Sequence, residues 1–411
     1  MIWRPFTQEK TATPAIKIIR GEGVYLFSET GQKYIDMISS WWVNIHGHGN
    51  REIAEAIYSQ AKTLEHVIFT KFSHDPAETL VKNLKKLLPS NLSKFFFSDN
   101  GSTSVEVALK MAYQYFRNIG TGKRSLFLCL KGGYHGDTFG AMSVAGKSSQ
   151  YHGIFSELFF NSHPIGVPEY YEDVEDIEEQ EIRILEEWEQ KLLEIGDRVC
   201  AIIVEPLLQG AAGMKLYRPK FLEKLVHVVR SYGILVIFDE VMTGFYRTGK
   251  MFAMDHTNVI PDFICLSKGI TGGFLPLGMT VTTEKVYDAF LSDDPRKTFI
   301  HGHSYTANPI SCAAANKSLE ILLRQKTVEN IRTIEEFHKR AVLKNIHRRR
   351  VLGTMSAFDI DSSEQRDYLV ESAFKEGIFL RPLGNTVYFL PPYCIAEEEL
   401  DKVYTIVNKF L

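Results

Sequence analysis

A lysine and an aspartate in this sequence each follow an apolar run of strand length. Lys268 comes after residues 263–267 and precedes a glycine-rich stretch, and Asp239 comes directly after residues 234–238. A lysine amine at the end of a buried strand can form a Schiff base with a carbonyl, and a carboxylate can keep a pyridine nitrogen protonated. The two residues together indicate a pyridoxal phosphate (PLP) site, although two unrelated polar strand ends would give the same pattern.

A third strand-like run leads into residues that suit a phosphate. Residues 95–97 are followed by small and polar residues that include Gly101 and Ser102. Thr103 and Glu106 fit a capping box, so we expect a helix to open here. The first backbone N–H groups of a helix have no partner inside it and favour an anion. Such helix starts are common, so this one indicates a phosphate site only in combination with the residues at the other strand ends.

Two further runs end in a tyrosine and in a glutamate. Residues 126–130 are followed by Tyr134 among glycines, where its ring can stack on a heteroaromatic ligand or simply cover the edge of the core. Residues 201–204 lead directly to Glu205, which either shapes the site or contacts a substrate. Because ligands bind at the carboxyl ends of the strands in an open parallel sheet, these strand ends together predict a PLP site.

The elements that position these residues alternate between strand-like runs and helical periodicity, which predicts βα units and a mostly parallel sheet. We expect a large α/β domain over residues 46–305, with helices flanking the sheet. Residues 306–411 are expected to form a smaller α+β domain, against which an N-terminal segment, residues 1–45, packs. The acidic stretch 169–197 predicts a surface helix, and the basic run 347–350 is interpreted as a solvated helix end.

Composition and charge exclude several other classes of protein. The 411 residues are 45% hydrophobic and 24% charged, as in ordinary globular proteins, and the net charge of −3 offers no basic field for nucleic acid or anionic lipid. No apolar run approaches the roughly 20 residues of a membrane helix. The N-terminus lacks a secretion signal, so we expect a cytoplasmic protein. The five cysteines and 13 histidines lack metal-ligand spacing, so we predict neither a metal site nor a disulfide framework.

The segments around the lysine and the aspartate resemble the signature of the class III aminotransferases, a family of fold-type I PLP enzymes. These segments are residues 238–241, 244–249 and 261–269, and the resemblance covers essentially the whole chain. It implies PLP as the cofactor. It also implies that Lys268 bonds to the cofactor and then acts as the proton-transfer base, while Asp239 pairs with the pyridinium nitrogen.

The same resemblance implies roles for other residues. Gly101 and Ser102 would hold the phosphate, and Tyr134 would stack on the cofactor ring while bordering the substrate. Three residues of one loop would reach the phosphate and substrate in the site of a neighbouring subunit, which implies a homodimer. These loop residues are Gly302, His303 and Ser304.

Other segments resemble one branch of the family, the adenosylmethionine–8-amino-7-oxononanoate aminotransferases of biotin biosynthesis. These segments are residues 2–8, 39–42 with 45–47, 132–140, 381–385 and 390–393. The branch implies transfer of an amino group to 8-amino-7-oxononanoate, which gives 7,8-diaminononanoate in a ping-pong reaction. S-adenosyl-L-methionine is the expected amino donor, and lysine stays open as the alternative.

Within this branch, aromatic and basic residues would bind the substrate. Trp41 would line the pocket for its aliphatic chain, and Arg381 would bind its distal carboxylate, a task that suits a guanidinium fork. Trp42 and Phe6 are assigned to the same pocket, and Phe6 lacks the hydroxyl of the tyrosine that the branch often carries. Adjacent tryptophans are awkward in a strand, where neighbours face opposite ways. Arg247 either lines the substrate channel or pairs with a surface carboxylate.

Two other activities fit the same cofactor residues. Another class III ω-amino acid aminotransferase, using pyruvate or 2-oxoglutarate, would also bind a chain that ends in a carboxylate. A PLP aminomutase would need no external donor, and a non-catalytic binding protein would need neither Lys268 nor Asp239. Met242 stands where most class III enzymes carry a glutamine that contacts the cofactor, and this departure favours the branch named above, which also tends to lack that glutamine.

Overall fold

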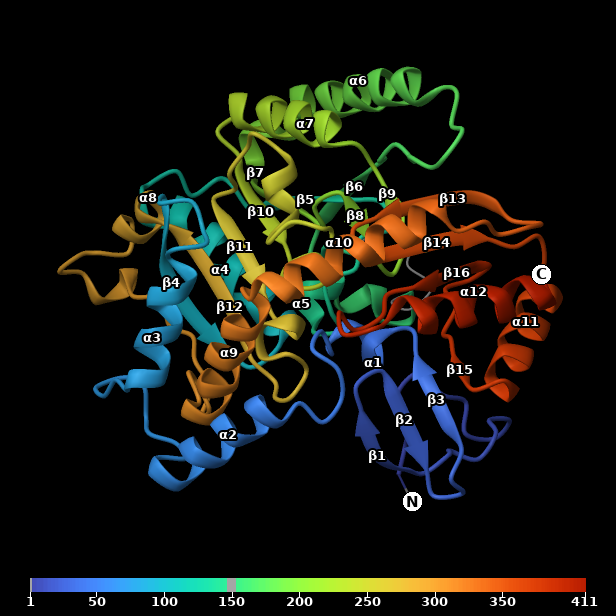
Figure 1. Ribbon diagram of the computed structural model, residues 1–411. Coiled ribbons are helices and arrows are strands. Elements are labelled where there is room, and N and C mark those ends of the chain that lie inside the picture. Colours follow the sequence, from blue (N-terminus) through green and yellow to red (C-terminus); the bar gives the residue numbers. More distant parts are fainter. Residues whose placement is uncertain (1, 146–152) are drawn as a thin grey trace.

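A computed structural model describes residues 2–145 and 153–411. Met1 and residues 146–152, which belong to the predicted N-terminal segment and large domain, lie outside this description. The chain forms a large part around one sheet and a smaller part in which N-terminal strands pack beside C-terminal elements (Figure 1).

The large part is built on a sheet that has seven strands among the described residues, in the order β4-β12-β11-β10-β7-β5-β6. Strand β12 runs antiparallel to both of its neighbours, and all the other pairs are parallel, so the predicted mostly parallel α/β sheet is confirmed. All five predicted strands are present. The strands are β4 (Leu92–Ser98), β5 (Leu126–Leu130), β6 (Ser162–Ile165), β7 (Val199–Val204), β10 (Leu235–Asp239), β11 (Phe263–Leu266) and β12 (Gly278–Thr283).

Both faces of this sheet are buried, which explains why its central strands β5, β7, β10 and β11 are almost entirely apolar instead of alternating. In β11, Phe263 and Cys265 pack in one core with residues of α4, while Ile264 and Leu266 pack in another core with residues of α6 and α7. The helices of the large part are α2 (Arg51–Thr63), α3 (Asp75–Leu84), α4 (Gly101–Asn118), α5 (Phe139–Ser143), α6 (Ile177–Ile195), α7 (Pro219–Ser231), α8 (Glu284–Asp288) and α9 (Pro309–Leu322). Short 3-10 helices and a small hairpin complete it: η1 (Gly153–Leu158), η2 (Gly196–Arg198), η3 (Ala253–His256), η4 (Lys268–Thr271), η5 (Pro295–Lys297), β8 (Leu208–Gln209) and β9 (Lys215–Leu216).

The start of α4 differs from the predicted capping box. Asn100 is the N-cap, because its side chain accepts a hydrogen bond from the N–H of Thr103 at 3.0 Å. The hydroxyl of Thr103 accepts the reciprocal bond from the N–H of Asn100 at 3.1 Å. Thr103 thus lies inside the first turn and cannot be its cap. Glu106 instead accepts hydrogen bonds from the hydroxyl of Thr138 and the N–H of Gly140, so it supports the loop that follows β5.

The smaller part combines the first strands of the chain with its C-terminal elements (Figure 1). Strand β3 pairs in parallel with β15, and Ile35 lies opposite Ile378. A packing of the N-terminal segment on the C-terminal part is therefore observed, while the boundaries at residues 45 and 305 stay a prediction. The elements are β1 (Ile18–Glu22), β2 (Tyr25–Ser28), β3 (Lys33–Asp36), α10 (Gln325–Arg340), β13 (His347–Leu352), β14 (Met355–Asp359), α11 (Ser363–Lys375), β15 (Ile378–Phe379), β16 (Thr386–Phe389) and α12 (Glu397–Phe410).

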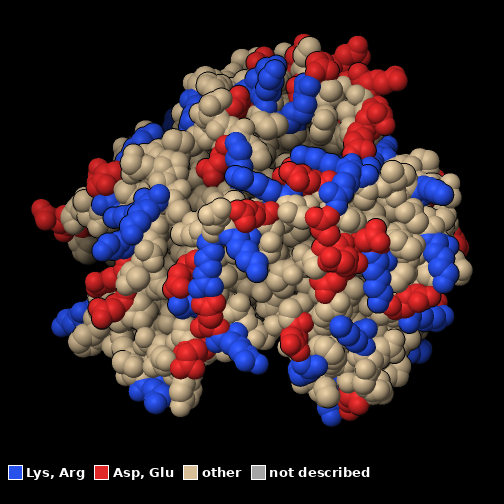
Figure 2. Space-filling model, in the orientation of Figure 1, with Lys and Arg blue, Asp and Glu red and all other residues tan. Residues whose placement is uncertain are grey.

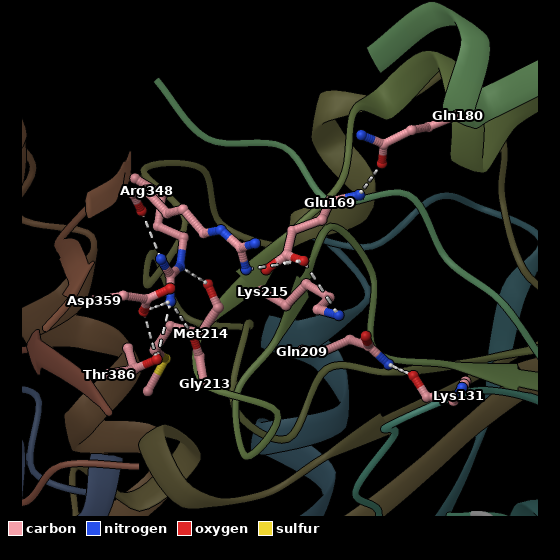
Figure 3. A network of polar contacts seen from close by, with 11 residues as sticks. Lys131, Glu169, Gln180, Gln209, Gly213, Met214, Lys215, Arg348, Asp359 and Thr386 are labelled. Carbon is pink, nitrogen blue, oxygen red and sulfur yellow. Dashed lines mark hydrogen bonds and ion pairs between the residues drawn. The ribbon is translucent and has the colours of Figure 1, made fainter. Parts of the chain in front are cut away.

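The interpretation of residues 347–350 as a solvated helix end is wrong. They lie in β13, and Arg350 is buried. Its guanidinium donates to the carbonyls of Gly213 and Met214 in the large part and to Asp359 in the small part, where Thr386 also donates to Asp359. Figure 3 shows these partners gathered where the two parts meet. A buried cation needs such partners, so this arginine joins the two parts instead of facing water.

The distribution of surface charge, the composition of the helices and the grouping of metal-ligating side chains bear on the partners of the protein. Basic and acidic side chains are interspersed on the face shown in Figure 2. Among the helices of residues 2–145 and 153–411, none combines the length and the apolar composition of a membrane span. Within the same residues, no group of three or more His, Cys, Asp or Glu side chains is arranged to hold a metal ion.

Candidate active site

A cavity of about 650 Å³ lies where the predicted strand ends meet. It opens at the carboxyl ends of the parallel strands and at the N-terminus of α4. Strand β4 joins this edge because it runs antiparallel to β12, which is itself antiparallel to β11. The predicted residues that line the cavity are Gly101, Ser102, Tyr134, Asp239, Lys268 and Trp42, and the lining also includes Glu205 and Met242.

Lys268 is the first residue of η4, and Ser267 separates it from the end of β11. Its φ of +45° lies in the left-handed region, which residues other than glycine rarely adopt and which is typical of functional sites. The side chain is half-buried and faces the cavity, with Nζ 4.6 Å from the centre of the Trp42 ring. Burial lowers the pKa of the amine to about 8, although the nearby carboxylates oppose this shift. The lowered pKa increases the unprotonated fraction, which is the form that attacks an aldehyde.

Asp239 ends β10 and is held from two sides. Its Oδ2 lies 2.7 Å from Nδ1 of His135, and its Oδ1 accepts a hydrogen bond from the N–H of Val241 at 3.0 Å. Both side chains are buried, and Nε2 of His135 has no hydrogen-bond partner. The tautomer of His135 that fits this contact has its hydrogen on Nδ1, and this N–H donates a hydrogen bond to the carboxylate of Asp239. His135 was not among the predicted site residues, although it directly follows Tyr134.

The N-terminus of α4 forms a cradle that tolerates no added side-chain atom. A Cβ at Gly101 would lie 2.7 Å from Cγ1 of Val241, and a Cβ at Gly136 would lie 1.8 Å from Oγ of Ser102. Gly136 also has a φ of +119°, which favours glycine. Ser102 Oγ accepts a hydrogen bond from the N–H of Asp137 at 3.1 Å, which leaves its own proton free to be donated. A tight cradle of N–H groups beside a free hydroxyl suits a phosphate.

Glu205 connects the two loops that follow β5 and β7. Its Oε2 accepts from the N–H of Tyr134 at 3.0 Å, and its Oε1 accepts from the N–H of Gly210 at 3.0 Å. Burial raises the pKa of this carboxyl to about 7, and His135 opposes the shift. Because both oxygens bind backbone groups, Glu205 shapes the cavity. The phenol of Tyr134 donates to Oδ2 of Asp137 at 3.0 Å, which fixes its ring at the cavity wall.

The adjacent tryptophans lie in a left-handed turn, α1 (Ser39–Trp42). All four residues have positive φ, namely +50°, +46°, +69° and +72° in chain order. This conformation costs an L-residue about 1–2 kcal/mol. Because Trp41 and Trp42 lie in this turn and not in a strand, their side chains do not have to face opposite ways. Trp42 lines the cavity, while the guanidinium of Arg381 lies 3.9 Å from the centre of the Trp41 ring.

Phe6, Trp41 and Arg381 form one stack beside the cavity, not part of its lining. The rings of Phe6 and Trp41 are 5.5 Å apart between centres. The stack is next to the cavity because Trp41 is bonded to Trp42. The substrate roles of these residues stay predictions.

Arg247 fits neither of its two sequence interpretations. It is only 1% exposed, and its guanidinium donates to the carbonyls of Trp42 at 3.0 Å and Pro391 at 3.1 Å. Burial lowers the pKa of this group. Arg247 therefore holds the tryptophan turn against the C-terminal part instead of lining the channel or pairing with a surface carboxylate. Because it binds backbone carbonyls, no sequence pattern identified this role.

Met242 lines the cavity, whereas the loop of residues 302–304 lies outside its lining. Met242 is buried against Gly210, where a Cβ would come within 2.4 Å of its sulfur.

Gly302 and Ser304 are exposed and His303 is half-buried, and none of the three lines the cavity of its own chain. Their predicted role in a neighbouring subunit is therefore untested.

Known proteins resemble this chain over its whole length. The family described as aminotransferase class-III matches residues 6–411. A protein of Synechococcus elongatus named adenosylmethionine-8-amino-7-oxononanoate aminotransferase is 48% identical over 422 residues, which cover 100% of this chain and 98% of that protein. The crystal structure of the protein of that name from Methanocaldococcus jannaschii has a TM-score of 0.90 and 35% identity, and the match covers 100% of this chain and 96% of the other. A PLP-bound amine transaminase from an uncultivated Pseudomonas species has a TM-score of 0.90 and 28% identity, with 100% and 98% covered.

Proposed function

Because this chain belongs to the class-III aminotransferase family, we propose that it transfers an amino group to 8-amino-7-oxononanoate and so makes 7,8-diaminononanoate for biotin biosynthesis. The observation that carries the proposal is the meeting of Lys268, Asp239 and the α4 cradle in one cavity beside the tryptophan turn. The similarity to proteins named for this reaction supports the choice of acceptor.

PLP is the cofactor of this enzyme, as in its family. The residues of the cavity fit it, because they combine a lysine amine of lowered pKa, a buried carboxylate and an anion cradle from which Cβ atoms are excluded. When bound, PLP supplies an aldehyde that takes up the amino group and a ring that accepts electrons. Lys268 would hold the aldehyde, and Gly101 and Ser102 would hold the phosphate.

The residues of the chain then divide the work of the reaction. Nζ of Lys268 would take a proton from the α-carbon of the amino donor and deliver it to the carbon of the cofactor that was its aldehyde carbon. Asp239 would keep the ring nitrogen of the cofactor protonated, and His135 orients that carboxylate through its 2.7 Å contact. The apolar wall formed by Trp42, Phe274 and Leu275 excludes water from the reacting atoms.

The acceptor would be recognised by the tryptophan turn and Arg381. An aliphatic chain packs on the indoles, and the guanidinium that lies over Trp41 binds the distal carboxylate. S-adenosyl-L-methionine is proposed as the amino donor. Lysine is the competing donor, and the assay below separates the two.

A homodimer with shared sites completes the proposal. Residues 302–304 lie in the sequence between Ile300 and Tyr305, whose side chains are 80% and 66% exposed. Large apolar side chains grouped on a surface typically mark an interface. A cytoplasmic location is proposed as well, and free cysteines such as Cys129 and Cys265 fit a reducing compartment.

The test is an assay of the purified protein with PLP and 8-amino-7-oxononanoate. S-adenosylmethionine and lysine are offered in parallel, and diaminononanoate is detected by mass spectrometry. We expect product with S-adenosylmethionine. No product with either donor, in a preparation whose cofactor absorbance bleaches with other amines, would instead indicate an ω-amino acid aminotransferase. Product formed without any external donor would indicate an aminomutase.

A further inference from the structure

A buried carboxylate outside the cavity holds the turn that carries both tryptophans. Asp36, the last residue of β3, is 0% exposed. Its Oδ1 accepts a hydrogen bond from the N–H of Ile38 at 3.2 Å, and its Oδ2 accepts one from the hydroxyl of Ser40 at 2.7 Å. Nε2 of His48 lies 3.0 Å from the same Oδ2. The carboxylate thus binds the residue before the turn, a residue inside the turn and the chain that follows it.

These hydrogen bonds act where the backbone is least favourable. Ser40 has φ +46° and ψ +54°, and the residues on either side of it are left-handed as well. An isolated chain of L-residues would leave this conformation, so side-chain contacts have to hold it. Ser39 contributes a second tether, because its hydroxyl donates to the carbonyl of Leu390 at 2.6 Å.

The position of both indoles depends on this turn. The indole N–H of Trp42 donates to the hydroxyl of Tyr388 at 3.0 Å, and the ring faces Nζ of Lys268 in the cavity. Trp41 lies under Arg381. If the turn relaxed to an extended strand, the two adjacent side chains would face opposite ways. At least one indole would then leave its present partner.

We propose that Asp36 is a positioning residue for the acceptor substrate. By holding the left-handed turn through Ser40 and the N–H of Ile38, it keeps the indoles where an aliphatic chain ending in a carboxylate would lie. The inference rests on the proposed function, which supplies the acceptor. It predicts that loosening the turn weakens acceptor binding more than it slows the half-reaction with the amino donor.

Two variants of Ser40 separate the backbone from the hydroxyl. Ser40→Ala removes the hydrogen bond and keeps a residue that disfavours positive φ, so we expect KM for the acceptor to rise about tenfold. Ser40→Gly removes the same hydroxyl but adopts positive φ at no steric cost. We therefore expect Ser40→Gly to recover most of the acceptor affinity. In both variants the half-reaction with the amino donor, followed by cofactor absorbance, should lose less rate than the half-reaction with the acceptor.

Asp36→Asn tests the carboxylate itself, with Asp361→Asn as a matched control. Asp361 is an exposed carboxylate whose ion pair with His347 lies in the small part, away from the turn. Asp36→Asn should raise KM for the acceptor and alter the near-ultraviolet circular dichroism of the tryptophans, whereas Asp361→Asn should do neither. Because both changes act on one contact, the double variant of Asp36→Asn with Ser40→Ala should be no worse than Asp36→Asn alone.

Three results would overturn the inference. One is an unchanged tryptophan spectrum in Ser40→Ala and Asp36→Asn. Another is Ser40→Gly impaired as severely as Ser40→Ala, and the third is an equal loss of rate in both half-reactions. If Asp36→Asn does not fold, the two Ser40 variants still decide. Failure of the proposed function can be told apart, because the unaltered protein would then make no diaminononanoate. In that case the tryptophan spectra still test whether Asp36 holds the turn.

Discussion

The cofactor half of the cavity and the substrate half beside it differ in how the chain builds them. Asp239 ends β10 and Lys268 lies just beyond the end of β11, and these two strands pair in parallel. Trp42, by contrast, is fixed by Tyr388, which is 346 residues away, and by Arg247, which is 205 residues away. The cofactor half therefore depends on one rigid sheet, and the substrate half depends on contacts between distant segments. Changes in the first should affect turnover with every substrate, and changes in the second should affect the acceptor more than the amino donor.

The largest effect is expected from Lys268→Ala in the cofactor half. Loss of the amine removes both the covalent attachment and the proton-transfer base, so we expect turnover to fall about 10³-fold or more. Mass spectrometry after borohydride reduction should find no cofactor linked to the chain. Lys285→Ala changes an exposed lysine on α8 and should leave both readouts unchanged. A lysine-linked cofactor in Lys268→Ala would contradict the assignment.

Asp239→Asn should have the next largest effect, because an amide cannot keep the ring nitrogen protonated. We expect kcat to fall about 10²-fold with both donor and acceptor. His135→Asn is the comparison, since it weakens the orientation of the carboxylate and leaves its charge. Its loss should be smaller than that of Asp239→Asn. Near-normal turnover in Asp239→Asn, measured by pre-steady-state absorbance, would remove Asp239 from the cofactor half.

Arg381→Ala should separate the two halves of the cavity. Loss of a charged hydrogen-bonding partner should raise KM for the acceptor by about 10–100-fold, while the donor half-reaction keeps its rate. Arg381→Lys keeps the charge but not the planar fork, so its KM for the acceptor should lie between those of the unaltered protein and of Arg381→Ala. Steady-state kinetics with each substrate varied in turn provide the measurement. An equal loss with donor and acceptor would mean that the halves are not independent.

The smallest effect concerns stability and pH. Burial raises the folded pKa of Glu205 to about 7 from an ordinary value of 4.5, so its protonated form is favoured in the folded state. Its contribution to stability is thus fully present below pH 4.5 and is lost as pH rises through about 7. Urea unfolding should show the unaltered protein losing stability relative to Glu205→Gln over this range, by up to about 3 kcal/mol. A constant difference across the range would contradict the raised pKa.

The contrast between the two halves also explains which features were predictable from the sequence. Each strand end of the cofactor half is a local pattern, and Lys268, Asp239 and Tyr134 all line the predicted cavity. The contact of His135 with Asp239 spans 104 residues, so no local pattern identified it. The N-cap at Asn100 was missed because two competing caps lie three residues apart.

The substrate half was predictable only in its residue types. The sequence gives no sign that residues 39–42 form a left-handed turn, since none of them is a glycine. The burial of Arg247 and Arg350 was also missed. Both guanidinium groups bind backbone carbonyls of distant segments, and such acceptors are present at every position of a chain.

The hydrogen bonds of Arg350 have a mechanical consequence for access to the cavity. They attach the small part of the molecule to Gly213 and Met214, on the same segment as Glu205 and Gly210. Breaking a buried hydrogen bond of this kind costs about 1–3 kcal/mol. This wall and the small part should therefore move as one rigid unit. The wall of the cavity that Glu205 forms should therefore keep its place relative to the small part when substrates enter and leave.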